Sequence, residues 1–143
     1  MSSIVVDANL AVALVVPLPY SAAARAKFDT WAKDGTEILA PALWGYEITS
    51  SLRKAIRTGY LAGDKAEEAL HAILALGVVE ISATRELHAA ALVWAAKLNA
   101  TVAYDAAYLA IAESRQVELW TADARLVAAA KALEIKWVRA VGA

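Results

Sequence analysis

Four acidic side chains stand at positions in this sequence where carboxylates can act together. Three follow an apolar run at the start of a helical pattern and one lies inside such a pattern; in chain order they are Asp7, Glu47, Asp105 and Asp123. A parallel α/β sheet would bring all four to one edge. Gathered carboxylates repel one another, so such a cluster implies a divalent cation that prefers oxygen ligands. The four residues therefore predict metal-dependent hydrolysis, with Mg²⁺ or Mn²⁺ as the ion.

The elements that would position these acids alternate along the chain. We expect strands at 4–6, 37–40, 78–81, 118–120 and 135–138. Between them apolar residues recur at helical spacing, as at Ala24, Phe28 and Trp31. This alternation predicts an α/β fold of one domain, residues 1–143, built as a three-layer α/β/α sandwich. Its central sheet should be mainly parallel, with about five strands.

Several residues mark the expected ends of helices. Gly35 follows the stripe of Ala24, Phe28 and Trp31 and predicts a C-terminal stop. Asp64 and Glu67 have the spacing of a capping box before the next helical stretch. Thr84 is expected to cap the helix that follows it.

The acids also have a simpler interpretation. Asp7, Asp105 and Asp123 each precede a helical pattern, and a short carboxylate is a typical N-cap there. Glu47 is different, because it lies within a helical pattern but off its apolar stripe. The two interpretations are compatible, since a cap residue at the carboxyl end of a strand already faces the crevice of the sheet.

The composition limits the class of protein. Apolar residues make up 60% of the 143 residues and the mean hydropathy is +0.47, yet the longest apolar runs are too short to span a bilayer. We find no signal peptide and expect a cytoplasmic protein without membrane association. The absence of cysteine excludes disulfides and thiolate metal sites. The apolar excess predicts a homodimer, with Trp31, Trp94 and Trp137 as aromatic residues that one small core would leave partly uncovered.

Basic residues gather at one place. The net charge of −1 gives no global attraction to nucleic acid, so any such binding must be local. Arg53, Lys54 and Arg57 lie near the end of the helix that carries Glu47. They are either a solvated helix end that complements the helix dipole or an RNA-binding patch that contacts phosphates.

Four ordered segments resemble the motifs of the PIN-domain family, and specifically those of VapC-type toxins. The segments are Val5-Val6-Asp7-Ala8-Asn9-Leu10, Trp44-Gly45-Tyr46-Glu47-Ile48, Tyr104-Asp105-Ala106-Ala107-Tyr108-Leu109-Ala110 and Trp120-Thr121-Ala122-Asp123. The resemblance covers essentially the whole chain. It assigns the four acids to the family's metal-binding positions. It also matches Asn9 and Thr121 to positions where a short polar side chain helps to hold the site.

The resemblance implies an activity and a partner. It implies an endoribonuclease that leaves a 5′-phosphate and a 3′-hydroxyl, silenced in its own cell by an antitoxin whose flexible tail wraps the toxin. We expect the apolar helices around 10–16 and 28–31 to supply a groove for an amphipathic partner helix. The acids would then attract an Arg or Lys from the tail.

Other classes of function are less well supported by the residues. A haloacid-dehalogenase-like site would need Asp-x-Asp, and Asn9 holds the second position here. A metal-free ribonuclease often uses histidines, but His71 and His88 both lie in Ala-rich helical stretches away from the motifs. A PIN nuclease of RNA processing and a non-catalytic partner-binding module, whose acids are only caps, both remain open.

Overall fold

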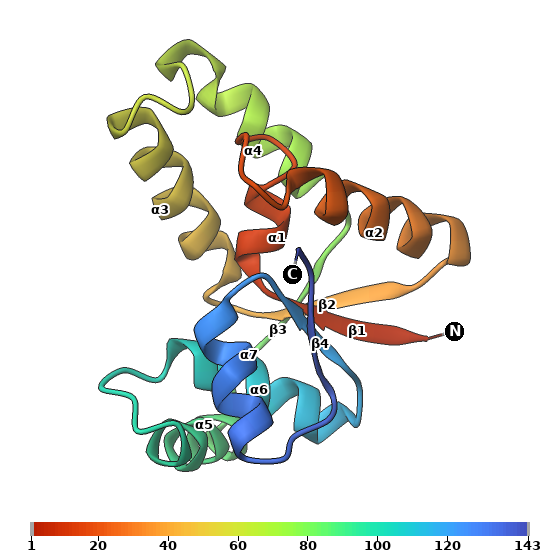
Figure 1. Ribbon diagram of the computed structural model, residues 1–143, viewed down its shortest axis with the longest axis vertical. Coiled ribbons are helices and arrows are strands. Elements are labelled where there is room, and N and C mark those ends of the chain that lie inside the picture. The colour runs from red at the N-terminus through yellow and green to blue at the C-terminus, as the bar shows by residue number, and fades with distance from the viewer. Residues whose placement is uncertain (1, 143) are drawn as a thin grey trace.

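The computed structural model describes residues 2–142 and is built around a five-stranded sheet (Figure 1). The strand order is β3-β2-β1-β4-β5, and every neighbouring pair is parallel. The strands are β1 (Ser3–Val6), β2 (Glu37–Pro41), β3 (Val79–Ile81), β4 (Leu119–Thr121) and β5 (Val138–Ala140). Val5 pairs with Leu39 on one side and with Leu119 on the other, which places β1 at the centre.

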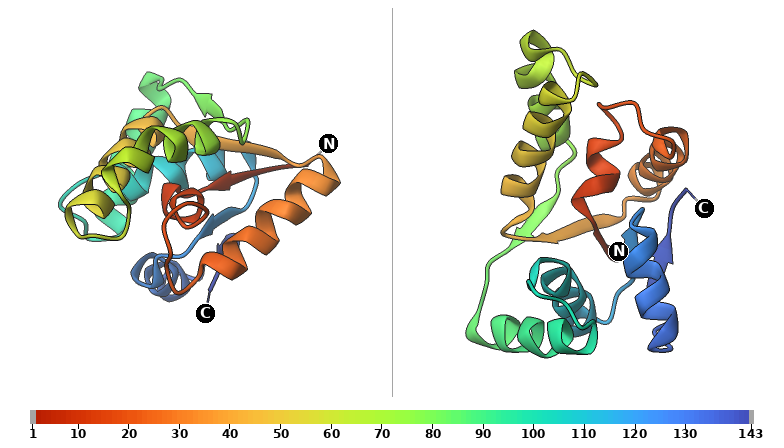
Figure 2. Two further views of the ribbon diagram at one scale, coloured as in Figure 1. Left: turned by 90° about the horizontal axis from the view of Figure 1, so that it is seen from above. Right: turned by 60° about the vertical axis from the view of Figure 1, so that its left-hand side comes forward.

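Helices cover both faces of the sheet. They are α1 (Ala8–Val12), α2 (Ser21–Asp34), α3 (Trp44–Arg57), α4 (Ala66–Leu74), α5 (Arg85–Lys97), α6 (Tyr104–Arg115) and α7 (Ala124–Ala132). The first four lie on one face and the last three on the other (Figures 1 and 2). This arrangement confirms the predicted three-layer α/β/α sandwich. None of the helices within residues 2–142 has both the length and the apolar character that a membrane span requires.

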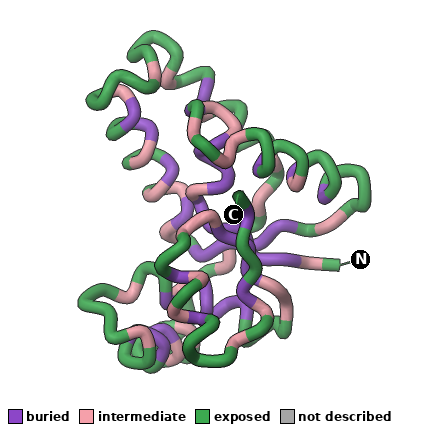
Figure 3. The backbone as a smooth tube through the Cα atoms, viewed as in Figure 1, coloured by how far each residue is buried: buried purple, intermediate pink, exposed green. Residues whose placement is uncertain are grey.

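The central strands of the sheet are made of buried residues, as Figure 3 shows. Val5, Val6 and Leu119 are almost completely enclosed, which explains why these strands read as apolar runs rather than as alternating patterns. The tryptophans also enter this core. Trp31 packs edge-on against Trp120, with ring centroids 5.7 Å apart, and Trp94 packs against Trp137 at 5.8 Å. The expectation that one core leaves Trp31 and Trp94 uncovered is therefore wrong, because both are buried.

Most apolar residues of the expected partner groove, around 10–16 and 28–31, are buried in the core. Leu10 and Val12 on α1, and Phe28 and Trp31 on α2, all belong to the buried core. Their apolar side chains already contact the sheet and the neighbouring helices. Leu14 and Phe28 nevertheless line a depression of about 320 Å³, so a partner groove at this place stays a prediction.

Local features at the helix ends were predicted with mixed success. Gly35 ends α2 with a φ of +67°, and Thr84 Oγ1 accepts a hydrogen bond from Leu87 N at 3.1 Å, so both predictions are confirmed. The capping box is wrong. A single 3-10 turn at Gly63–Lys65 leads into α4, and neither Asp64 nor Glu67 makes a cap hydrogen bond.

The last strand begins later than expected, at Val138 rather than at 135. Glu134 has a φ of +59°, which turns the chain after α7. Ile135 N then donates to Ala130 O at 2.9 Å, so this residue still belongs to the end of the helix. Pairing with β4 starts only where Val138 lies beside Leu119.

Candidate active site

Asp7 lies at the middle of the carboxyl edge of the sheet, where the neighbouring strands β1 and β4 end. Asp7 directly follows β1, and its backbone N–H donates to Trp120 O on β4 at 2.9 Å. Its side chain is buried, although it is charged in water. Thr121 ends β4 beside it, and Thr121 Oγ1 donates to Asp7 Oδ2 at 2.8 Å. Parallel pairing of β1 with β4 thus places these side chains in contact across 114 residues of sequence.

Two short polar side chains fasten the neighbouring loops to one another. Thr121 Oγ1 accepts from Asn9 Nδ2 at 3.4 Å and from Asp123 N at 3.0 Å. Asn9 Oδ1 in turn accepts from Ala122 N at 3.3 Å. Asn9 and Thr121 thereby hold the junction of β1 and α1 against the junction of β4 and α7, which is what a supporting role in a site requires.

The N-cap interpretation holds for one acid and fails for two. Asp123 caps α7, because its Oδ1 accepts from Arg125 N at 2.9 Å and from Leu126 N at 3.3 Å. Asp7 occupies the N-cap position of α1, yet its side chain makes no cap hydrogen bond. Asp105 lies inside the first turn of α6 rather than before it. A role in capping therefore does not account for Asp7 or Asp105.

Glu47 and Asp105 reach the same edge from helices rather than from strands. A helix that connects parallel strands runs back antiparallel to them. A helix after a strand therefore starts at the carboxyl edge of the sheet. Glu47 lies in the first turn of α3, after β2, and Asp105 lies in the first turn of α6, before β4.

Tyr108 is a residue of this site that the sequence interpretation missed. It lies on α6 one turn after Asp105, is almost fully buried, and donates from its hydroxyl to Glu47 Oε1 at 2.5 Å. Asp105 and Tyr108 are three residues apart, which puts both on one helical face. This spacing is the sequence signal from which a place for Tyr108 in the site could be predicted. Burial, together with the nearby Asp7 and Glu47, raises the pKa of the Tyr108 hydroxyl, so it remains a hydrogen-bond donor.

The charges of the acids act on one another. Burial raises the pKa of Asp7 to about 7, the hydrogen bond from Thr121 opposes this, and Glu47 and Asp105 raise it further. Burial also raises the pKa of Glu47, with Asp105 adding to the effect although the Tyr108 hydrogen bond opposes it. The pKa of Asp105 is raised by partial burial and then by Asp123. The structure therefore brings Asp7, Glu47, Asp105 and Asp123 together, and we call these four residues the acidic cluster.

The acidic cluster has the chemistry of a cation site without a preassembled ligand shell. No Lys or Arg within residues 2–142 forms an ion pair with any of the four carboxylates. In the same range, no three Asp, Glu or His side chains surround a common point closely enough to hold a metal ion. A divalent cation would supply the missing positive charge, and the oxygen donors fit Mg²⁺ or Mn²⁺.

The basic residues are not part of this cluster. Arg53, Lys54 and Arg57 are exposed on the second half of α3. Arg57 lies ten residues after Glu47, or about 15 Å along the helix axis. His71 and His88 are exposed on α4 and α5.

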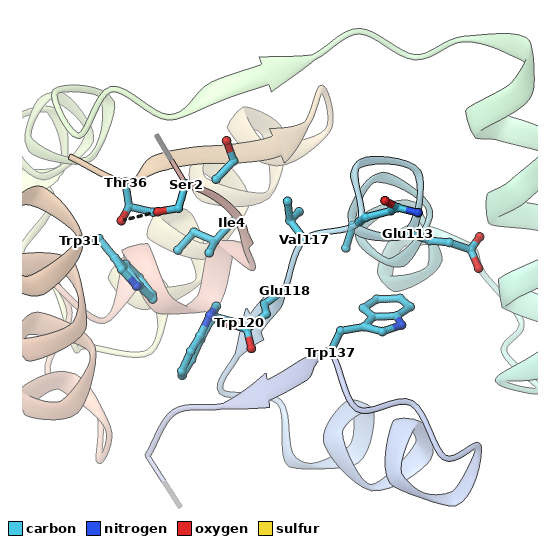
Figure 4. Close-up of a pocket in the computed structure, with 12 residues that line it drawn as sticks. Ser2, Ile4, Trp31, Thr36, Glu113, Val117, Glu118, Trp120 and Trp137 are labelled. Carbon is cyan, nitrogen blue, oxygen red and sulfur yellow. Dashed lines mark hydrogen bonds between the residues drawn. The ribbon is translucent and has the colours of Figure 1, made fainter. Parts of the chain in front are cut away.

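A large cavity lies away from the acids. It measures about 980 Å³ and is lined by the start of β1 and the residues just before β4, at the amino edge of the sheet. Figure 4 shows Trp31 and Trp120 on one side of this cavity and Trp137 on the other. None of the four acids lines it. We locate the candidate active site at the carboxyl edge, because the interacting ionisable groups lie there.

Comparison with known proteins agrees with this fold. A model of the PIN domain matches residues 4–132. The chain belongs to the PIN domain family. PIN domains are generally nucleases, so the acids described above lie in the fold of a nuclease. No curated protein matches the chain significantly.

Two solved structures share the fold of this PIN domain. PAE2754 from Pyrobaculum aerophilum is 26% identical, with a TM-score of 0.68, and the match covers 98% of this chain and 84% of that one. A chain in the structure of VapBC2 from Rickettsia felis, bound to a DNA fragment from their promoter, is 12% identical with a TM-score of 0.66. That match covers 96% of both chains.

Proposed function

We propose that this PIN domain is a divalent-metal-dependent endoribonuclease and the toxin of a VapBC-type toxin–antitoxin pair. The observation that carries the proposal is the environment of Asp7. This carboxyl is buried, its pKa is raised to about 7, and within the described part of the chain no basic side chain forms an ion pair with it. A buried carboxylate without a counter-charge is costly, and a bound cation removes that cost.

The four acids would hold Mg²⁺ or Mn²⁺, and the other residues would orient them. When bound, the ion activates water and neutralises charge at a phosphodiester. Thr121 fixes one oxygen of Asp7, Tyr108 fixes one oxygen of Glu47, and the start of α7 fixes one oxygen of Asp123. The more exposed Asp105 makes no side-chain hydrogen bond within residues 2–142 and has a raised pKa. An oxygen of Asp105 that does not contact the ion could accept a proton from the water that attacks the phosphodiester.

The proposed partners follow from the resemblance and from the surface. RNA as the substrate rests on the four matching motifs, and the likeness to a chain of the Rickettsia felis VapBC2 structure supports the same fold. An antitoxin tail would place an Arg or Lys beside the acidic cluster. A homodimer would bury the exposed apolar side chains of Leu92 and Val93 on α5 and of Val102 beyond it.

A cleavage assay on single-stranded RNA tests the nuclease assignment. Wild type with Mn²⁺ should cleave the RNA internally and leave 5′-phosphates. Asp7→Asn and Asp105→Asn should lose this activity and bind Mn²⁺ more weakly in calorimetric titration. Asp29→Asn is the matched control, because this carboxylate is exposed on α2. Undiminished cleavage in excess EDTA, or full activity of both site variants, would contradict the proposal.

A further inference from the structure

Two tyrosines are exposed beside the acidic cluster. Tyr46 in the first turn of α3 has 80% of its surface exposed, and Tyr104 at the start of α6 has 60%. Neither ring packs against another aromatic ring within residues 2–142. Burial in the core therefore does not explain these side chains.

Both tyrosines line the same depression in the surface. It has a volume of about 490 Å³, and its remaining lining residues are Leu43, Glu47, Ser50 and Ser51. Each tyrosine directly precedes an acid of the cluster, since Tyr46 is followed by Glu47 and Tyr104 by Asp105. Because Glu47 itself lines the depression, the depression adjoins the proposed catalytic centre, and the first turns of α3 and α6 each bring an aromatic ring to it.

A basic stripe extends from this depression along α3. Tyr46, Ser50, Arg53 and Arg57 recur at intervals of four, three and four residues, which places them on one helical face. All four are exposed, whereas the opposite face of α3, at Trp44, Ile48, Leu52 and Ala55, is buried. The exposed face thus begins with an aromatic ring beside the acids and continues to two positive charges, about 10 and 16 Å further along the helix axis.

We propose that this face is a subsite for single-stranded RNA, in which Tyr46 and Tyr104 stack on unpaired bases next to the cleaved phosphate. Arg53 and Arg57 contact the RNA phosphates next to the stacked bases. The inference rests on the proposed nuclease function and adds how the substrate is held. Aromatic stacking suits this chain because its net charge of −1 provides no general attraction to RNA. Stacking requires bases that are not paired, so the subsite would select single-stranded or looped RNA over duplex.

Leucine substitutions test the stacking, because leucine keeps an apolar side chain but lacks the aromatic face. Tyr46→Leu and Tyr104→Leu should each weaken binding of a fluorescein-labelled single-stranded RNA by about 5- to 100-fold in anisotropy titrations with EDTA. Tyr46→Phe and Tyr104→Phe should bind as wild type does. Tyr60→Leu is the matched control, because Tyr60 is 63% exposed but does not line the depression.

A second set of measurements separates this subsite from the catalytic centre. In cleavage assays with Mn²⁺, the leucine variants should show a KM raised by a similar factor and an unchanged affinity for Mn²⁺. Arg53→Ala and Arg57→Ala should each lower the slope of log affinity against log salt by about 1.

The possible failures are distinguishable. If wild type cleaves RNA and the leucine variants bind and cleave it equally well, the subsite is wrong and the nuclease function stands. If wild type binds RNA through the tyrosines but does not cleave it, the nuclease assignment is wrong and the subsite stands. If light scattering shows that the leucine variants turn a dimer into a monomer, this face is a subunit interface and the subsite is wrong.

Discussion

Replacing Asp7 by asparagine should stabilise the metal-free protein at neutral and alkaline pH, although it removes a residue of the proposed active site. Burial is the largest cause that raises the pKa of this carboxyl from 3.8 to about 7, and Glu47 and Asp105 add to it. The folded state therefore resists the ionisation of Asp7, whereas the unfolded chain does not. Asparagine has nearly the same shape and no charge, so it does not carry this penalty.

The size of the effect depends on pH. Below about pH 4, Asp7 is protonated in both states and contributes no difference. Between pH 3.8 and about 7 the unfolded chain releases the proton and the folded state keeps it, so the free energy of unfolding falls by about 1.4 kcal/mol per unit. Above that range the full penalty of about 4 kcal/mol remains. The pKa of about 7 already includes the hydrogen bond from Thr121, so the expected gain for Asp7→Asn is the full penalty of about 4 kcal/mol.

Urea denaturation followed by tryptophan fluorescence measures this gain. In EDTA, the free energy of unfolding of Asp7→Asn should exceed that of wild type by about 4 kcal/mol near pH 8 and by only about 2 kcal/mol near pH 5. Asp29→Asn, the exposed control, should have the same free energy of unfolding as wild type at both pH values. Mn²⁺ at 100 times its Kd for wild type should then stabilise wild type by about 2.7 kcal/mol, and should stabilise the variant less. A variant that is less stable than wild type near pH 8 in EDTA, or a gap that does not change with pH, would refute the reasoning.

Two further substitutions probe the residues that hold the acids. Tyr108→Phe removes the hydroxyl that donates to Glu47. It should lower the Mn²⁺ affinity by about 10- to 100-fold in calorimetric titration. An unchanged affinity would show that this hydrogen bond does not position Glu47. Thr121→Val removes a buried hydroxyl that makes three hydrogen bonds and should lower the free energy of unfolding by about 1–3 kcal/mol in urea. Thr49→Val, at an exposed position, should change stability little.

The sequence was most informative where local pattern and tertiary structure agree. Strands 4–6 and 118–120 were recognisable because burial on both faces makes a parallel strand continuously apolar. Thr84 and Gly35 were recognisable because a cap depends on the backbone next to it. The convergence of the four acids could be inferred from topology, since crossover helices begin at the carboxyl edge of the sheet.

The missed features depend on contacts between distant segments. The role of Tyr108 comes from Glu47, 61 residues away in sequence and on another helix. The burial of Trp31 depends on how α2 lies against Trp120 on β4. The late start of β5 depends on a left-handed residue, Glu134, which is uncommon for a glutamate and was not evident from its type.

The pairing of Asp7 with Thr121 affects when activity can arise during synthesis. A chain that ends before β4 contains Asp7, Glu47 and Asp105 but lacks Thr121 and Asp123, and β1 then has no neighbour on one side. Such a nascent chain has most of its acids and no complete site. The site of the proposed nuclease is therefore complete only once the chain has been made as far as Asp123.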